Sequence, residues 1–284
     1  MIPTAFDYQR ASSLDDALAK LQAARGAGKI IAGGHSLVPL MKLRLSEPKV
    51  LIDIGRIPGL SGIREAGGQI EIGAGTVHQD VASSALLQKA CPVVSEAAAV
   101  IGDPQVRNRG TLGGSLAHAD PAADYPAAML AVDADINLLG PKGTRTVKAR
   151  DFFRALFTVD LAPDEIITGV RFAPVRSTAY AKLHQRASHF AIVGVAACVA
   201  VRGGVFEATR VGLTGATSHA VRLPNVEAAL TGKPAKKDTI ATAAKIAGSD
   251  LSDVNADIHA SEAYRRAMIL VFTRRALEAA LARS

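Results

Sequence analysis

Two glycine-rich segments far apart in the chain place the strongest constraint on its fold. The first reads AGGHS over residues 32–36, and the second reads TLGGS over residues 111–115. Paired glycines let the backbone approach a ligand closely, because no Cβ stands in the way. Clustered backbone amides form concave sites for phosphate. Two such segments suit a ligand with two phosphates, so the sequence predicts a fold that brings them together around a dinucleotide.

The common nucleotide-binding motifs are missing from the sequence. No G-x-x-x-x-G-K-[ST] motif occurs, and no G-x-G-x-x-G motif follows a predicted strand. A dinucleotide would therefore be bound by a different kind of fold. The glycine pairs alone also leave open that both segments are ordinary turns.

Composition and charge exclude few classes of protein. The chain has 284 residues, of which 49% are hydrophobic, and its net charge is +7. A basic chain can bind nucleic acid, but these basic residues are spread along the sequence without an aromatic-rich basic stripe. We therefore expect no nucleic-acid partner, and we expect the positive charge to favour an anionic ligand and acidic partner surfaces.

The cysteines and the N-terminal segment predict a soluble cytoplasmic protein without a metal site. Cys91 and Cys198 lie in apolar contexts, and neither belongs to a C-x-x-C motif. An iron–sulfur cluster usually needs about four thiolates, so both cysteines are expected to be small buried hydrophobes. The N-terminal segment lacks the apolar stretch of a signal peptide. The longest apolar run, residues 190–201, is too short to span a membrane as a helix.

Periodicity and turn residues predict a mixture of helices and strands. Ser13 is the expected N-cap of a helix over residues 14–21, and Thr76 of a helix that extends to about residue 89. Gly67-Gly68 and Gly203-Gly204 are expected hairpin turns. Before a boundary near residues 173–177, we also expect strands at 29–32, 49–54, 135–139 and 165–172, and helices at 92–101 and 121–132. After it, we expect a strand through residues 180–184, two long strands and three helices ending at residue 282.

Three stretches resemble the FAD-binding flavoprotein subunits of the molybdenum hydroxylases. Residues 31–44 (IAGGHSLVPLMKLR) resemble the first FAD-binding loop of that family, and residues 107–124 (RNRGTLGGSLAHADPAAD) resemble the second. Residues 260–266 (ASEAYRR) resemble its last helix. The family includes the medium subunit of aerobic carbon monoxide dehydrogenase and the FAD domain of xanthine dehydrogenase. The resemblance covers nearly the whole chain, in order and at the expected spacing.

This resemblance implies an α+β fold with two parts. Residues 1–176 would form a two-lobed FAD-binding domain of the vanillyl-alcohol-oxidase type. Residues 177–284 would form the C-terminal flavoprotein domain of the carbon monoxide dehydrogenase type, a small domain with a three-stranded sheet covered by three helices.

The resemblance also implies a noncovalent FAD and an electron-transfer role. Its partners would be a large subunit that binds molybdopterin and a small subunit that carries two [2Fe–2S] clusters, assembled as a dimer of heterotrimers. Electrons from the substrate would pass through the clusters to FAD and then to an external acceptor, and no catalytic residue is expected in this chain. The alternatives are a self-sufficient FAD-dependent oxidoreductase of the same architecture and a non-enzymatic basic binding module.

The expected FAD-binding residues come from the two glycine-rich segments and from two later positions: Ala32, Gly33, Gly34, His35, Ser36, Leu37, Thr111, Leu112, Gly113, Gly114, Ser115, Asp124 and Lys182. Amides of both glycine pairs would hold the diphosphate, with hydroxyl groups as further donors. By resemblance Asp124 lies near the ribose–diphosphate, and Lys182 approaches the flavin. The alternatives are a helix N-cap for Asp124 and a solvated strand lysine for Lys182.

Several positions leave more than one interpretation open. Ser115 stands where the family most often has Asn, and His189 stands where an acid is common, so their effects on the flavin are open. His35 could attach flavin covalently, as histidines do in distant flavoproteins, but the resemblance implies noncovalent binding. The spacing of His118, Asp120 and Asp124 would also suit a metal, although the whole stretch matches the flavin motif.

Overall fold

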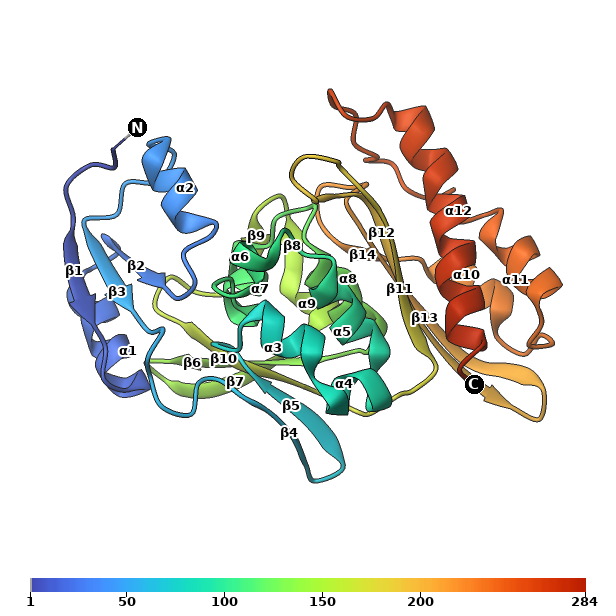
Figure 1. The fold of residues 1–284 in the computed structure, drawn as a ribbon, viewed down its shortest axis with the longest axis horizontal. Helices are drawn as coiled ribbons and strands as arrows, with labels where there is room; N and C mark the ends of the chain where they lie inside the picture. Colours follow the sequence, from blue (N-terminus) through green and yellow to red (C-terminus); the bar gives the residue numbers. More distant parts are fainter. Residues whose placement is uncertain (1) are drawn as a thin grey trace.

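The N-terminal lobe is a small parallel sheet in the order β1-β3-β2. The computed structural model describes residues 2–284. This sheet consists of β1 (Asp7–Arg10), β2 (Gly28–Ile31) and β3 (Val50–Asp53), and the helices α1 (Leu14–Ala23) and α2 (Leu37–Lys42) accompany it (Figure 1). Ser13 caps α1 as predicted, because its side chain accepts a hydrogen bond from the Asp16 amide. The first glycine-rich segment connects β2 to α2.

The second lobe is a five-stranded antiparallel sheet in the order β4-β5-β10-β6-β7. Its strands are β4 (Ile63–Ala66), β5 (Gln69–Gly73), β6 (Asp135–Gly140), β7 (Gly143–Lys148) and β10 (Ile166–Phe172). A short hairpin consists of β8 (Phe153–Ala155) and β9 (Thr158–Val159). The helices of this lobe are α3 (His78–Ser83), α4 (Ala85–Ala90), α5 (Pro92–Ala99), α6 (Pro104–Arg107), α7 (Leu112–His118), α8 (Asp124–Ala131) and α9 (Ala149–Phe152).

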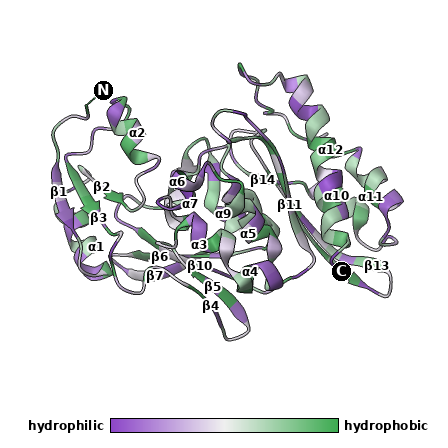
Figure 2. Cartoon of the chain, viewed as in Figure 1, coloured by the Kyte–Doolittle hydropathy of each residue, from purple (hydrophilic) through white to green (hydrophobic). Residues whose placement is uncertain are grey.

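The C-terminal part is an antiparallel sheet with helices on its outer side (Figure 1). The long strands β11 (Thr178–His184), β12 (Ala191–Arg202) and β13 (Val205–Thr214) agree with the prediction, and so do the helices α10 (Pro224–Leu230), α11 (Lys237–Ala244) and α12 (Glu262–Leu281). A two-residue strand, β14 (Val221–Arg222), adds a fourth strand to this sheet. Figure 2 shows green and purple alternating along α12, in keeping with its buried residues such as Ile269 and Phe272.

Helix α8 of the second lobe packs directly against the C-terminal sheet. Every residue of this helix is buried. A Cβ on Gly212 of β13 would lie only 2.2 Å from the Ala127 carbonyl oxygen, so the strand and the helix are in backbone contact. The Thr214 hydroxyl lies 2.7 Å from the Ala123 carbonyl oxygen and 2.9 Å from the Pro121 carbonyl oxygen. The start of α8 is therefore fixed by the C-terminal sheet.

The prediction of a single helix over residues 76–89 is wrong. The chain instead forms α3 and α4, which are separated by the extended Ser84. Thr76 is not the N-cap, because its hydroxyl is paired with the Gly62 amide and carbonyl, and Ser84 caps α4 instead. The helix expected from residue 121 begins at Asp124, and the short helices α2 and α7 were not predicted.

Both cysteines are buried and free, as the sequence predicts. Burial raises the pKa of the Cys91 thiol to about 12, so this group is an inert thiol at neutral pH. Within residues 2–284, none of the helices combines the length and the apolar character needed to cross a membrane.

Candidate functional site

The two glycine-rich segments are in direct backbone contact. A Cβ on Gly33 would lie 2.1 Å from the Arg109 carbonyl oxygen and 2.8 Å from the Gly110 Cα, so only glycine fits there. Gly34 has a φ of +80°, a conformation that also favours glycine. The fold therefore brings the segments together, as predicted.

A cavity of about 720 Å³ lies at this junction. Most of the expected cofactor-binding residues line it: Ala32, Gly33, Gly34, His35, Ser36, Leu37, Thr111, Gly113, Gly114, Ser115 and Asp124. Leu112 does not line the cavity, because its side chain is fully buried in the hydrophobic core. Lys182 is also missing from the cavity wall, since it lies behind Asp124.

The first segment carries the unpaired backbone donors. The amides of residues 33–37 have no hydrogen-bond partner among residues 2–284. Ser36 occupies the N-cap position of α2, but its side chain makes no capping bond. Consecutive unpaired amides in a turn form a concave site for an anion. This segment therefore has the donors that a diphosphate needs.

The second segment differs from the prediction, because the amides of residues 112–115 are already paired. The Leu112 amide donates to the Thr76 carbonyl at 3.0 Å, and the Gly113 amide donates to the Ala74 carbonyl at 2.8 Å. The Gly114 amide donates to the Thr111 hydroxyl at 3.1 Å. A Cβ on Gly113 would lie 2.6 Å from the Ala74 Cβ. The glycines of this segment thus allow close packing, and the amides of Gly113 and Gly114 are not free donors as predicted.

Asp124 is held by two residues of β11. It is 4% exposed, and its carboxylate accepts hydrogen bonds from the Tyr180 hydroxyl at 2.6 Å and from Lys182 Nζ at 2.8 Å. Burial raises the pKa of Asp124 to about 6, although Lys182 acts in the opposite direction. The N-cap of α8 is Ala123, so Asp124 is not the cap.

Lys182 is a buried cation rather than a solvated strand lysine. Its side chain is only 3% exposed, and Nζ also donates to the Val100 carbonyl at 3.0 Å. It contacts the cavity wall through Asp124. Sequence analysis missed the third member of this cluster, Tyr180, because the pairing joins elements that are distant in the sequence.

Two residues with left-handed backbone conformations line the cavity, and a third, Ala119, lies between the lining residues His118 and Asp120. Ala119, Phe157 and His189 have φ values of 46°, 50° and 61°. Such conformations cost about 1–3 kcal/mol each and cluster at functional sites. The Phe157 ring contacts His118, with 5.1 Å between ring centroids, and His189 stacks on His184 at 5.4 Å. The cavity therefore has a partly exposed aromatic rim, which no local sequence signal revealed.

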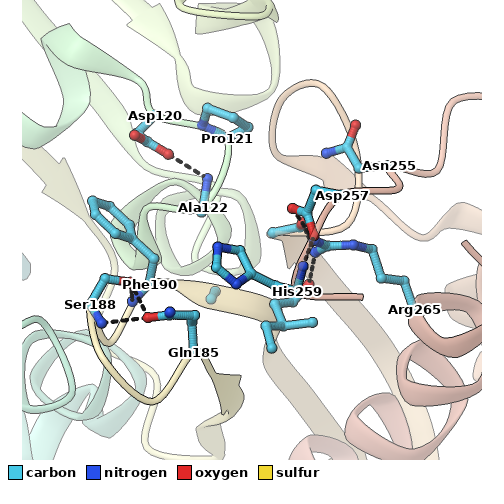
Figure 3. A pocket seen from close by; sticks show the side chains of 13 residues that line it. Asp120, Pro121, Ala122, Gln185, Ser188, Phe190, Asn255, Asp257, His259 and Arg265 are labelled. Atoms are coloured by element: carbon cyan, nitrogen blue, oxygen red, sulfur yellow. Dashed lines mark hydrogen bonds and ion pairs between the residues drawn. The ribbon is translucent and has the colours of Figure 1, made fainter. Parts of the chain in front are cut away.

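A smaller cavity of about 250 Å³ adjoins the large one and shares Asp120, Ser188 and Phe190 with it (Figure 3). Arg265 enters it from α12 with a side chain that is 3% exposed. Its guanidinium donates to the carbonyls of Ile192 and Gly215 and to the Asp257 carboxylate at 2.6 Å. These contacts join α12 to β12, to the residue that follows β13 and to the loop at Asp257, all of which line the smaller cavity.

The sequence and the fold both match a known family. Residues 4–175 match the model described as the FAD binding domain in molybdopterin dehydrogenase. Residues 178–280 match the model of the CO dehydrogenase flavoprotein C-terminal domain.

Individual relatives cover the chain almost completely. The carbon monoxide dehydrogenase medium chain of Hydrogenophaga pseudoflava is 40% identical, over 100% of this chain and 99% of the relative. The 6-hydroxypseudooxynicotine dehydrogenase complex subunit alpha of Paenarthrobacter nicotinovorans is 38% identical, over 100% and 97%. The solved carbon monoxide dehydrogenase from Hydrogenophaga pseudoflava superposes with a TM-score of 0.95 at 42% identity, over 100% of this chain and 99% of that chain. The chain therefore belongs to the family of FAD-binding medium subunits of molybdenum hydroxylases.

Proposed function

We propose that this chain binds FAD noncovalently and relays electrons within a heteromeric molybdenum hydroxylase. The observation that carries the proposal is the row of unpaired amides at residues 33–37, which borders a cavity of about 720 Å³. The second glycine-rich segment forms another part of the wall, where Gly33 lets the two backbones meet. These features fit a dinucleotide, and the family match supports FAD as its identity.

The residues of the chain bind and orient the cofactor. The amides of residues 33–37 would hold the diphosphate, and each hydrogen bond to a charged oxygen contributes about 1.5–3 kcal/mol. The hydroxyls of Ser36, Thr111 and Ser115 are further donors in the cavity wall. Asp124 would lie beside the cofactor, and Lys182 would act on it through Asp124. Bound FAD supplies the redox chemistry, because it accepts electrons and passes them on.

The same proposal assigns the remaining cofactors to other subunits. A molybdopterin-binding large subunit would oxidise the substrate, and a small subunit with [2Fe–2S] clusters would deliver the electrons, in a cytoplasmic dimer of heterotrimers. Residues 1–176 and 177–284 would be the two domains of this chain. The two family matches, which change over between residues 175 and 178, support that division.

Heat or acid denaturation is expected to release all of the flavin from the purified protein or its complex. Noncovalent binding leaves no bond to hold FAD once the amides of residues 33–37 lose their arrangement. Flavin absorbance is measured in the supernatant and in the precipitated polypeptide. Flavin that stays with the polypeptide would show covalent attachment, for example through His35.

The isolated chain loaded with FAD is expected to transfer electrons from a reductant to an artificial dye but to oxidise no carbon monoxide, aldehyde or heterocycle. Adding the molybdenum and iron–sulfur subunits should create substrate oxidation, with the flavin bleaching after the clusters are reduced. Stopped-flow absorbance follows both events. Substrate-dependent bleaching of the isolated chain would instead identify a self-sufficient oxidoreductase.

A further inference from the structure

His78 is a buried histidine in the wall of the large cavity. It is the first residue of α3, and it is 5% exposed. Its Nδ1 is buried and has no hydrogen-bond partner among residues 2–284. An unpaired buried polar atom costs about 1–3 kcal/mol. A histidine at this position therefore calls for a role beyond filling space.

The imidazole of His78 supports the junction of the two glycine-rich segments. A Cβ on Gly110 would lie 2.5 Å from His78 Nε2, and a Cβ on Gly33 would lie 2.8 Å from the Gly110 Cα. The His78 amide also donates to the Gly110 carbonyl at 3.0 Å. His78 thus touches the same glycine that touches the first segment. The position of the unpaired amides at residues 33–37 therefore depends on the contacts of His78 with Gly110 and of Gly110 with Gly33.

Burial keeps the His78 imidazole neutral in the cofactor-free site. It lowers the pKa of His78 to about 4, and the neighbouring His35 and Arg107 act in the same direction. The titratable groups on α3 and on the segments around His78 are Asp80 on α3, which is exposed, His35 in the first segment, Arg107 on α6, Arg109 beside Gly110, Asp124 and Tyr125 on α8, Glu96 on α5 and Lys89 on α4.

The carboxylates in this set do not compensate a charge on His78. Glu96 is bound to Arg283 and to the Tyr180 amide. Asp124 is bound to Lys182 and to the Tyr180 hydroxyl. The Tyr125 ring, 5.3 Å from the imidazole between centroids, adds no negative charge, because burial raises its pKa well above the usual value. A charged imidazole therefore lacks a counter-charge until an anion enters the cavity.

We propose that His78 is a positioning residue of the FAD site and that its imidazole takes up a proton from solvent when the cofactor binds. The inference rests on the proposed binding of FAD. A diphosphate held by residues 33–37 would bring negative charge to the junction that His78 supports, and a nearby opposite charge favours the protonated form of histidine. The charged imidazole would then attract the diphosphate and stabilise Gly110 in the position that FAD requires.

FAD affinity should depend on pH, because FAD binding and proton binding to His78 would favour each other. Because His78 would bind a proton more tightly in the FAD-loaded site, FAD affinity should rise as the pH falls through the pKa of His78 in that site. One linked proton changes the affinity by at most about tenfold per pH unit. The effect should level off near pH 4, where the imidazole is charged even without cofactor. Asp124 has a pKa of about 6 and titrates in an overlapping range, so variants are needed to separate the two groups.

The test titrates the deflavinated complex with FAD between about pH 5 and pH 8. The wild type should bind FAD more tightly at the lower pH, and His78→Gln should lose most of that slope while it still binds FAD at pH 8. Asp124→Asn is the matched comparison, and it should keep the part of the slope that belongs to His78. Calorimetry of the wild type in two buffers of different ionisation enthalpy should show net proton uptake at the lower pH.

Equal slopes for the wild type and His78→Gln would overturn the proposal. If His78→Gln does not fold, as judged by melting of the cofactor-free protein at pH 8, calorimetry of Asp124→Asn decides, and an absence of proton uptake in that variant overturns the proposal. A wild type that binds no FAD at any pH would instead contradict the proposed function itself, so the two failures are distinguishable.

Discussion

Gly33→Ala is expected to lower FAD affinity by at least about a hundredfold. The new Cβ would lie 2.1 Å from the Arg109 carbonyl oxygen, which is backbone and cannot rotate away. The two segments would have to separate, and the amides of residues 33–37 would move. Losing two hydrogen bonds to a charged diphosphate costs about 3–6 kcal/mol, and about 1.4 kcal/mol corresponds to a tenfold change in affinity. Fluorescence titration of the deflavinated protein measures the change.

Gly55→Ala is the matched control for this substitution. Its Cβ would meet the Asp53 carboxylate at 3.1 Å and the Ala32 carbonyl oxygen at 3.6 Å, and Gly55 does not line the cavity. We expect this variant to bind FAD nearly as tightly as the wild type. An FAD affinity of Gly33→Ala close to that of Gly55→Ala, in folded protein, would show that contact between the segments is not needed for binding.

Lys182→Met is expected to destabilise the protein by roughly 3–5 kcal/mol at neutral pH, because it leaves the buried Asp124 carboxylate without its cation. Asp124 already has a raised pKa in the folded state, about 6 against 3.8 for the free side chain. The folded state therefore binds this proton more tightly, and the group's contribution to stability declines as the pH rises from 3.8 through 6. Removing Lys182 raises the folded pKa further.

The loss of stability in Lys182→Met should therefore be larger at pH 8 than at pH 5, as measured by urea unfolding at both values. Lys245→Met, at an exposed position, is the control and should change stability little. The double variant Asp124→Asn/Lys182→Met should recover much of the loss, since no unpaired charge is then buried. A loss that does not depend on pH would contradict this account of the cluster.

Local sequence signals predicted the elements that depend on local chemistry. Gly67, Gly68, Gly203 and Gly204 all have positive φ values, which is why glycine pairs marked both hairpins correctly. Ser13 was found because an N-cap bonds within its own first turn. Thr76 failed as an N-cap because its hydroxyl pairs with Gly62, a contact that no local pattern encodes.

In the candidate site, too, sequence signals predicted the local features but not the contacts between distant segments. The glycine pattern located the junction, but the pairing of the Gly113 amide with Ala74 depends on how two distant segments align. The resemblance selected Asp124 and Lys182, yet their mutual contact comes from packing β11 near the start of α8. His78 carried no signal in the sequence, because its role depends on what lies against Gly110.

The contact between Asp124 and β11 has a consequence for biosynthesis. Translation delivers Asp124 before Tyr180 and Lys182, so a nascent chain that has completed both glycine-rich segments still lacks the partners of this carboxylate. A buried carboxylate without partners favours its protonated form or stays in water, and the start of α8 remains unanchored until β13 docks on it. Cofactor loading would therefore follow synthesis of the C-terminal sheet, and ribosome-stalled chains of increasing length should acquire FAD only once these strands have emerged.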